Sequence, residues 1–392
     1  MKPFRLPRTV IALATVSLLT DASSEMIYPL LPLFLSGVLG ASATALGAIE
    51  GAAESVAALL KLASGAWSDR LTRRKPLVVA GYVLASIVRP LIGLAQAAWH
   101  VGALRVTDRI GKGIRTSPRD ALIADAVAPS QRGAAFGVHR AGDHIGAVLG
   151  PLLAFGLLQF FGLSLRTVFL LAAIPAAMSL AVLLFGVREE RVHRANVDKP
   201  GLGADAPAGL GAQFWKYLGV LLLFSLGNAS DAFLLLRASA LGVAAAHIPL
   251  LWAAHHVVKA LANVRGGALS DRVGRRPLIV AGWAVYAIVY LAFARATMAW
   301  HAWALFLGYG LYFGLTEGVE KAFVADVVPD RLRGTAFGWF NFTLGLAALP
   351  ASLIFGLLWD RHGAATAFGV AAALAGAAAA LLLLIVPRRA VA

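Results

Sequence analysis

The chain has 392 residues, of which 59% are hydrophobic and only 14% are charged, and it contains no cysteine. Its mean hydropathy of +0.76 excludes an ordinary water-soluble protein of this length, because apolar runs long enough to cross a bilayer recur from end to end. The formal net charge of +15 is carried by short segments between those runs, which favours a topological role over nucleic-acid binding. Disulfides and thiolate metal sites are also excluded.

The apolar runs predict twelve membrane helices, each long enough at about 1.5 Å per residue to cross about 30 Å of hydrocarbon. In chain order the predicted spans are residues 9–36, 43–66, 77–97, 100–124, 135–160, 166–186, 216–241, 247–268, 278–296, 301–325, 335–358 and 364–386. No clear cleavage site follows the first span, which holds Asp21 and Glu25, so we interpret it as a transmembrane helix rather than a signal peptide.

Basic residues collect in the loops that follow the even-numbered spans, whereas the other loops hold little beyond Arg166 and Arg361. This asymmetry predicts that both termini lie in the cytoplasm. The one sizeable hydrophilic connection, residues 188–215, predicts a cytoplasmic linker between an N-terminal domain over 1–187 and a C-terminal domain over 216–392.

A loop motif occurs twice, as GAWSDRLTRR at residues 65–74 and as GALSDRVGRR at residues 267–276. Each copy predicts a tight loop between membrane helices, and its acid is expected to pair with basic groups and helix ends and so latch the cytoplasmic face. The alternative is that the basic residues only fix topology. The residues of this gate motif are Gly65, Asp69, Arg70, Arg73, Arg74, Gly267, Asp271, Arg272, Arg275 and Arg276.

A second repeat supports the same division of the chain. The run from Ala124-Asp125 to Gly137 returns as the run from Ala325-Asp326 to Gly338, 201 positions later. Parallel repeats of this kind predict an all-α membrane protein built from two pseudo-symmetric six-helix bundles, related by an axis along the membrane normal, with a central cavity between them.

The form G-x-x-x-D-R-x-x-R-R, the helix count and the repeat together resemble the major facilitator superfamily of secondary transporters, along the whole chain. Gly146, Gly150 and Pro151 resemble the G-x-x-x-G-P element of its antiporters, although Ala154-Phe155 stands where a glycine pair is expected. Arg105 and Gly113 resemble the family's buried arginine element, but Arg109 stands where a glycine is usual. The resemblance implies that the first, fourth, seventh and tenth helices line the cavity.

Ionisable residues inside membrane helices are costly and are therefore candidates for substrate binding or proton coupling. These candidates are Asp21, Glu25, Arg105, Asp108, Arg109, Lys112, Asp143, Asp231, Glu317 and Glu320. Asp21 and Glu25 are four apart and share a helix face, which suits a pair that takes up and releases a proton. Alternatively, neighbours such as Ser23, Ser24 and Tyr28 satisfy them structurally.

The basic stripe of Arg105, Arg109 and Lys112 is expected to contact substrate, and Arg109 is the predicted mobile partner of a cavity acid. Part of the charge on this helix has an alternative role, because Arg119-Asp120 and Glu320-Lys321, which are 201 positions apart, could bridge the two halves as two ion pairs. His139, Asp143 and His144 offer an alternative reading of the fifth span, because imidazole and carboxylate at this spacing suit a transition metal. Hydrogen bonding within the helix explains the same residues without a metal.

These features predict a transporter rather than an enzyme, with no cofactor and no GxxxxGK[ST] motif for ATP. We expect a monomer in the bacterial inner membrane that moves a small molecule or ion by alternating access. The partial antiporter element and the buried acids favour proton-coupled efflux. Alternatives are export of a transition-metal cation such as nickel or iron, export of an anionic metabolite or siderophore, and a membrane sensor that no longer transports.

Overall fold

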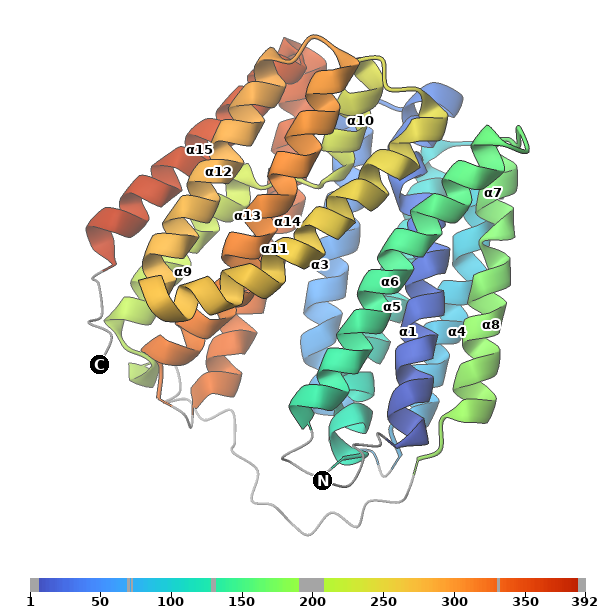
Figure 1. Ribbon diagram of the computed structural model, residues 1–392, viewed down its shortest axis with the longest axis horizontal. Helices are drawn as coiled ribbons and strands as arrows, with labels where there is room; N and C mark the ends of the chain where they lie inside the picture. The colour runs from blue at the N-terminus through green and yellow to red at the C-terminus, as the bar shows by residue number, and fades with distance from the viewer. Residues whose placement is uncertain are drawn as a thin grey trace. The chain divides into compact units, whose positions relative to one another are not determined.

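The computed structural model describes residues 7–68, 71, 73–127, 132–189, 208–329 and 332–386. All regular secondary structure within these residues is helical, and they contain no strand (Figure 1). The fold class predicted from the sequence, an all-α membrane protein, is therefore confirmed. The chain forms two compact units, of which unit 1 comprises Met1–Ala41, Val56–Ala195 and Ala244–Ala253, and unit 2 comprises Ser42–Ser55, Asn196–Val243 and Ala254–Ala392.

Unit 1 contains six long helical stretches. They are α1 (Arg8–Ile27), the second half of α3 (Ala43–Ser68), α4 (Lys75–Leu91), α5 (Ala98–Asp125), α6 (Arg132–Gln159), and α7 (Leu165–Leu171) followed by α8 (Ala173–Gly186). Short 3-10, α and π turns continue α1 as η1 (Tyr28–Leu30), α2 (Leu31–Leu33) and η2 (Phe34–Val38), because Pro29 and Pro32 remove backbone donors from a regular helix. Another 3-10 turn, η3 (Ile92–Leu94), ends α4.

Unit 2 contains the first half of α3 and the helices of the C-terminal part of the chain. These are α9 (Ala212–Gly227), α10 (Ala232–Ala240), most of α11 (Ile248–Val273), α12 (Arg275–Arg295), α13 (Ala299–Val327), α14 (Arg333–His362) and α15 (Ala364–Ile385). A 3-10 turn, η5 (Ala208–Leu210), precedes α9, whereas η6 (Ala245–His247), which precedes α11, belongs to unit 1. Residues 190–207 of the predicted linker lie outside the described residues, so the domain boundary stays a prediction.

Each predicted span corresponds to a helical segment, and two of the segments have internal breaks that were not predicted. The span 166–186 is divided at Ala172, and the span 216–241 is divided at residues 228–231. Within the described part of the chain, nine segments are long and apolar enough to cross a membrane. The other three predicted spans correspond to α5, α11 and α13, whose polar and charged side chains lower their hydropathy.

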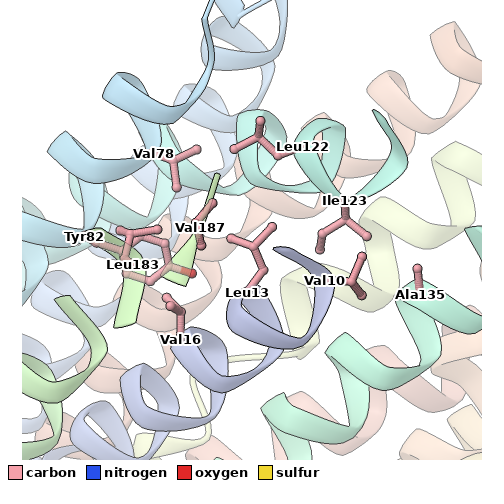
Figure 2. Close-up of a cluster of buried hydrophobic side chains, with 10 residues drawn as sticks. All are labelled: Val10, Leu13, Val16, Val78, Tyr82, Leu122, Ile123, Ala135, Leu183 and Val187. Atoms are coloured by element: carbon pink, nitrogen blue, oxygen red, sulfur yellow. The ribbon is translucent and has the colours of Figure 1, made fainter. Parts of the chain in front are cut away.

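A cluster of buried apolar side chains joins five segments at the end of unit 1 where α1 begins (Figure 2). Val10, Leu13 and Val16 of α1 pack with side chains from α4, α5, α6 and the end of α8, namely Val78, Tyr82, Leu122, Ile123, Ala135, Leu183 and Val187. In a bilayer the lipid tails are as apolar as these side chains, so close van der Waals packing rather than the hydrophobic effect holds the helices together here.

The same ion pair occurs once in each half of the sequence. Arg74 Nη1 binds Asp125 Oδ2, and Arg275 Nε lies 3.4 Å from Asp326 Oδ2. The arginines are 201 positions apart, and so are the aspartates. The gate motif is thus tied to the acid that follows the fourth or tenth predicted span, and the sequence repeat has a structural counterpart.

The basic residues that follow these two arginines, Lys75 and Arg276, both donate to carbonyl oxygens at the end of a helix. Lys75 Nζ donates to the carbonyl oxygens of Leu184 (3.1 Å) and Val187 (2.7 Å), and Arg276 donates to those of Leu382 and Leu383. The last carbonyls of a helix have no partner within the helix, so each basic side chain satisfies the end of α8 or of α15.

Helix α14 holds the first half of α3 very closely within unit 2. A Cβ on Gly47 would collide with the carbonyl oxygen of Ser352, and one on Gly51 would lie 2.8 Å from Leu349 Cα. Ser55 Oγ donates to the carbonyl oxygen of Gly345 at 2.7 Å. Glycine at the contact positions therefore lets the two backbones touch.

Asp360, in the last turn of α14, caps the beginning of α3. Its two carboxylate oxygens accept hydrogen bonds from the backbone N–H groups of Ala43 (3.0 Å) and Thr44 (2.8 Å). An acid is unfavourable at the C-terminus of its own helix and favourable at the N-terminus of another. The contact with α3 thus offsets the cost to α14.

Asp360→Ala is expected to lower the free energy of unfolding by about 1 kcal/mol, the usual loss of an N-cap. Asp360→Asn should lose less, because its amide keeps one oxygen acceptor. The thermal midpoint of the detergent-solubilised protein, followed by size-exclusion chromatography, measures the effect. An alanine variant as stable as the wild type would show that the cap contributes nothing.

Candidate functional site

Helices α1 and α6 approach each other along a row of glycines spaced four residues apart in α6. A Cβ on Gly142, Gly146 or Gly150 would collide with a backbone carbonyl oxygen of α1, that of Ala14, Leu18 or Ala22 respectively. Pro151 follows directly, inside α6. The residues that resemble the antiporter element therefore form the surface on which α1 packs, and we call this contact the α1–α6 seam.

The two acids of the first predicted span lie on this seam. A Cβ on Gly146 would be 3.0 Å from Asp21 Cβ, and one on Gly150 would be 3.0 Å from Glu25 Cβ. Both acids are half-buried. The close packing of two helices thus brings together two features that the sequence presented separately, the acid pair and the glycine element.

Asp143 of α6 adds a third carboxylate beside the seam. It accepts a hydrogen bond from Ser17 Oγ of α1 and lies within electrostatic range of Asp21. Two basic side chains of its own helix are near it, with His139 Nδ1 at 3.6 Å and Arg140 Nη1 at 3.7 Å from Oδ2. Asp21, Glu25 and Asp143 therefore belong to one local group in unit 1.

Glu25 also has a partner from a distant part of the sequence. Trp252 Nε1 of α11 donates to Glu25 Oε2 at 2.8 Å, and the Trp252 ring lies 5.4 Å from that of Tyr28. Residues Ala244–Ala253 belong to unit 1 in space, although they precede most of α11 in unit 2. Nothing in the spacing of Trp252 indicated this role.

Asp108 of α5 is held between two buried arginines. Arg89 Nε of α4 lies 2.7 Å from Asp108 Oδ1, and Arg105 Nη1 lies 3.8 Å from Asp108 Oδ2. Arg89 also donates to the carbonyl oxygen of Thr20 in α1 at 2.9 Å. This network links three helices. The sequence analysis missed Arg89, although a lone arginine within the apolar span 77–97 was a usable indication.

Three basic residues of α5 lie within electrostatic range of the acids of α1. Arg105, Arg109 and Lys112 all act electrostatically on Glu25, and Lys112 acts on Asp21 as well. The guanidinium of Arg105 also lies over the ring of Tyr28, 5.5 Å from its centre. Unit 1 therefore contains a mixed network of acids and bases in its membrane-spanning helices.

The three remaining candidate acids lie in unit 2 and have different kinds of partner. Asp231, at the break before α10, accepts a hydrogen bond from Tyr309 at 2.6 Å. Glu320 accepts one from Trp283 Nε1 at 2.9 Å. Glu317 lies 3.4 Å from Lys259 Nζ.

Positions that are equivalent in the two halves carry different chemistry. The buried ion pair of unit 1 is formed by Arg89 and Asp108. The residues 201 positions later in the sequence are Tyr290 and Tyr309, whose ring centres lie 6.1 Å apart. Arg109 corresponds to Gly310. Charged groups therefore occupy positions in unit 1 that aromatic or small residues occupy in unit 2.

The metal alternative receives little support from the geometry. His139 and Asp143 form a pair, but no group of three or more His, Cys, Asp or Glu side chains in the described residues is arranged to hold a metal ion. His144 is therefore not the third member of a ligand set with them.

Parts of the gate motif lie outside the described residues, namely Asp69 and Arg70, and the side chain of Asp271 is not described either. Gly65 lies within α3 and Gly267 within α11, while Arg73 and Arg272 are exposed. The second copy was expected to be a loop from residue 269, but α11 continues to Val273. Gly274 alone separates it from α12, with a φ of +95° that favours glycine.

The model of the major facilitator superfamily matches residues 13–349 and 217–392 of the chain. An uncharacterized MFS-type transporter of Methanocaldococcus jannaschii is 34% identical over 360 residues, which cover 90% of this chain and 89% of the relative. An uncharacterized protein of Mycobacterium tuberculosis is 32% identical over 366 residues, with 90% and 87% covered. The multidrug resistance protein MdtH of Shigella boydii is 28% identical over 135 residues, or 34% of each chain.

Solved structures share the fold at low sequence identity. A nucleoside transporter, NupG, superposes with a TM-score of 0.82 at 12% identity, covering 96% of this chain and 99% of that one. A bacterial homologue of the human lysosomal transporter Spinster superposes with a TM-score of 0.78 at 17% identity, covering 96% and 95%. Together with the match of the family model, these findings show that the chain belongs to the major facilitator superfamily and is a multi-pass membrane transporter rather than an enzyme.

Proposed function

We propose that the chain is a proton-coupled secondary transporter that exports a small solute by alternating access. The observation that carries the proposal is the α1–α6 seam, where Asp21 and Glu25 lie against the glycines of the antiporter-like element. A carboxylate inside a membrane helix is costly and is seldom kept without a function.

The grouping of the acids supports proton coupling. Asp21 is within electrostatic range of both Glu25 and Asp143, and like charges in a medium of low dielectric repel strongly. Binding of a proton by one member relieves this repulsion. Lys112, Arg109 and Arg105 stand near enough to compete for the same carboxylates, so a change in their positions would favour release of the proton.

The seam also supports export as the direction. Gly146, Gly150 and Pro151 resemble the antiporter element, and one partial relative is named as a multidrug resistance protein. A metal cation is a weaker candidate substrate, because the described residues hold no three-ligand group. A sensor without transport would have no need of a membrane-buried network such as Arg89, Asp108 and Arg105.

We further propose that the protein lies in the bacterial inner membrane as a monomer, with both termini in the cytoplasm. The support is the asymmetry of basic residues between loops. The latch role of Asp69 and Asp271 stays a prediction. The ion pairs of Arg74 with Asp125 and of Arg275 with Asp326 connect the gate motif to the ends of α5 and α13.

Everted membrane vesicles containing the protein test the function. Respiration acidifies the vesicle interior and quenches acridine orange, and a solute exchanged for protons restores the fluorescence. Organic cations, nickel salts, organic anions and neutral solutes should be tried in turn. Restoration by at least one of them, absent in vesicles without the protein, is expected. Solute movement that is indifferent to a protonophore would contradict proton coupling.

Asp21→Asn and Glu25→Gln are expected to reduce proton-driven exchange to the level of vesicles without the protein, because neither amide can carry a proton. Both variants should remain folded in detergent, since the amides keep the shape and the hydrogen-bonding capacity of the acids. Size-exclusion chromatography checks folding and the vesicle assay checks exchange. Exchange at the wild-type rate in both variants would assign the acids a structural role.

Gly150→Ala is expected to destabilise the protein by about 1–3 kcal/mol, because the added methyl group has no space against Ala22. Gly156→Ala is the matched control on the same helix, since a Cβ there meets nothing within 4 Å. The thermal midpoints of the two variants make the comparison. Equal midpoints would show that the seam is looser than described.

A further inference from the structure

Lys259 of α11 places its ammonium group in an aromatic and acidic setting within unit 2. Its Nζ lies 3.8 Å from the centre of the Phe313 ring and 3.4 Å from Glu317 Oε2. Asn263 Nδ2 donates to the same carboxylate oxygen at 3.2 Å. An ammonium over an aromatic face, next to a carboxylate, is the arrangement by which proteins recognise cationic nitrogen.

The ring of Phe313 belongs to a larger aromatic group. Tyr309 lies 5.2 Å from Phe313, edge to face, and His255 stacks on Tyr309 at 5.3 Å. His255 also meets Phe313 at 5.7 Å. These rings come from α11 and α13, so the position of Phe313 beside Lys259 is fixed by packing between two helices.

Two carboxylates lie near Lys259. Glu317 is bound to it directly, and Asp231 lies within electrostatic range of both Lys259 and Glu54. Asp231 is positioned by its hydrogen bond from Tyr309, one of the rings of the same aromatic group. A cation in place of the Lys259 ammonium would therefore meet an aromatic face and carboxylates that are already oriented.

These groups are partly exposed at the protein surface. The side chain of Lys259 is 18% exposed and that of Glu317 is 35% exposed, whereas Arg89 and Asp108 of unit 1 are 5% and 1% exposed. The Arg89–Asp108 pair is enclosed by packing, whereas the Lys259–Glu317 pair is partly exposed.

We propose that Phe313, Glu317 and Asp231 form a recognition site for the ammonium group of an organic cation, and that Lys259 is an internal stand-in which the solute displaces. The proposal rests on the proposed function, for which it names the substrate class. An anion would have to bind Lys259 in competition with Glu317 and against the field of Asp231, so the carboxylates favour a cation.

The ammonium group of Lys259 also matters in the part of the transport cycle when no solute is bound. While Lys259 occupies the site, Glu317 is not left as an unpaired charge in the membrane interior, which would be costly. The solute must therefore bind more favourably than a tethered lysine, and this competition lowers its apparent affinity.

Purified protein in detergent tests the site with probes of matched shape and different charge. Choline is the cation, 3,3-dimethylbutan-1-ol is its neutral isostere and 3,3-dimethylbutanoate is the anion. Benzyltrimethylammonium is a larger cation of the same chemistry. The cations are expected to raise the thermal midpoint by an amount that increases with their concentration. The neutral and anionic probes should leave it unchanged.

Two variants, each with a control variant, then assign the effect. Lys259→Met should tighten cation binding, measured by titration calorimetry, by about fivefold to tenfold, because the internal competitor is gone. Lys216→Met, which removes an exposed positive charge from α9, controls for the change in net charge and should leave the affinity unchanged. Glu317→Gln should abolish binding, whereas Asp326→Asn, a similar acid-to-amide change in the last turn of α13, should not.

Loss of cation binding in Lys259→Met would overturn the proposal, as would stabilisation by 3,3-dimethylbutanoate that depends on Lys259. Absence of any cation effect in both the wild type and the folded Lys259→Met protein would also overturn it. These measurements use no proton gradient. Failure of proton exchange in vesicles with cation binding intact would refute the proposed function alone, and proton-coupled exchange of an anion would refute the cation site alone.

Discussion

The close contact of α1 and α6 is the constraint on which the account of unit 1 depends. Three glycines of α6 let its backbone reach the carbonyl oxygens of α1, and any larger residue would force the helices apart. The contact sets the positions of Asp21 and Glu25 and brings Asp143 near them. The basic residues of α5 and Trp252 then complete the surroundings of these acids. A packing requirement and a chemical requirement are met by the same few residues.

Asp108 of unit 1 and the acids Asp231 and Glu320 of unit 2 are satisfied by different kinds of partner. In unit 1 the network of Arg89, Asp108 and Arg105 neutralises charge with charge. In unit 2 the hydroxyl of Tyr309 and the indole N–H of Trp283 donate to Asp231 and Glu320. This difference separates two tasks in the proposed mechanism. In our proposal the acids of unit 1 handle the proton, and the aromatic group of unit 2 meets the solute.

Much of the fold could be predicted from the sequence, because membrane helices are encoded locally by apolar runs and loop composition. The breaks near Ala172 and Asn228 were missed, although Pro175 follows the first and the turn-forming run at residues 227–231 marks the second, because each lies inside an apolar run long enough for one span. The extension of α11 through the second gate motif was missed because its charged residues resemble those of a loop. Only Gly274 carries the turn, and its role depends on backbone geometry.

The candidate site was predictable in its members and not in its pairings. Charges inside apolar spans, such as Asp21, Asp108 and Glu317, are conspicuous in the sequence. Their partners come from other helices, as with Trp252 for Glu25 and Arg89 for Asp108, and sequence spacing within one helix carries no information about such contacts. The glycine repeat was the exception, because small residues spaced four apart indicate a helix contact by themselves.

The most direct test of the central claim is to observe the proton on the seam. Infrared difference spectra of the reconstituted protein, recorded between alkaline and acidic buffer, report the carbonyl stretch of a protonated carboxyl group. The account predicts such a band in the wild type, and its loss in the folded protein with both Asp21→Asn and Glu25→Gln. A band of unchanged intensity in that double variant, or no band in the wild type, would contradict the assignment of proton transfer to these acids.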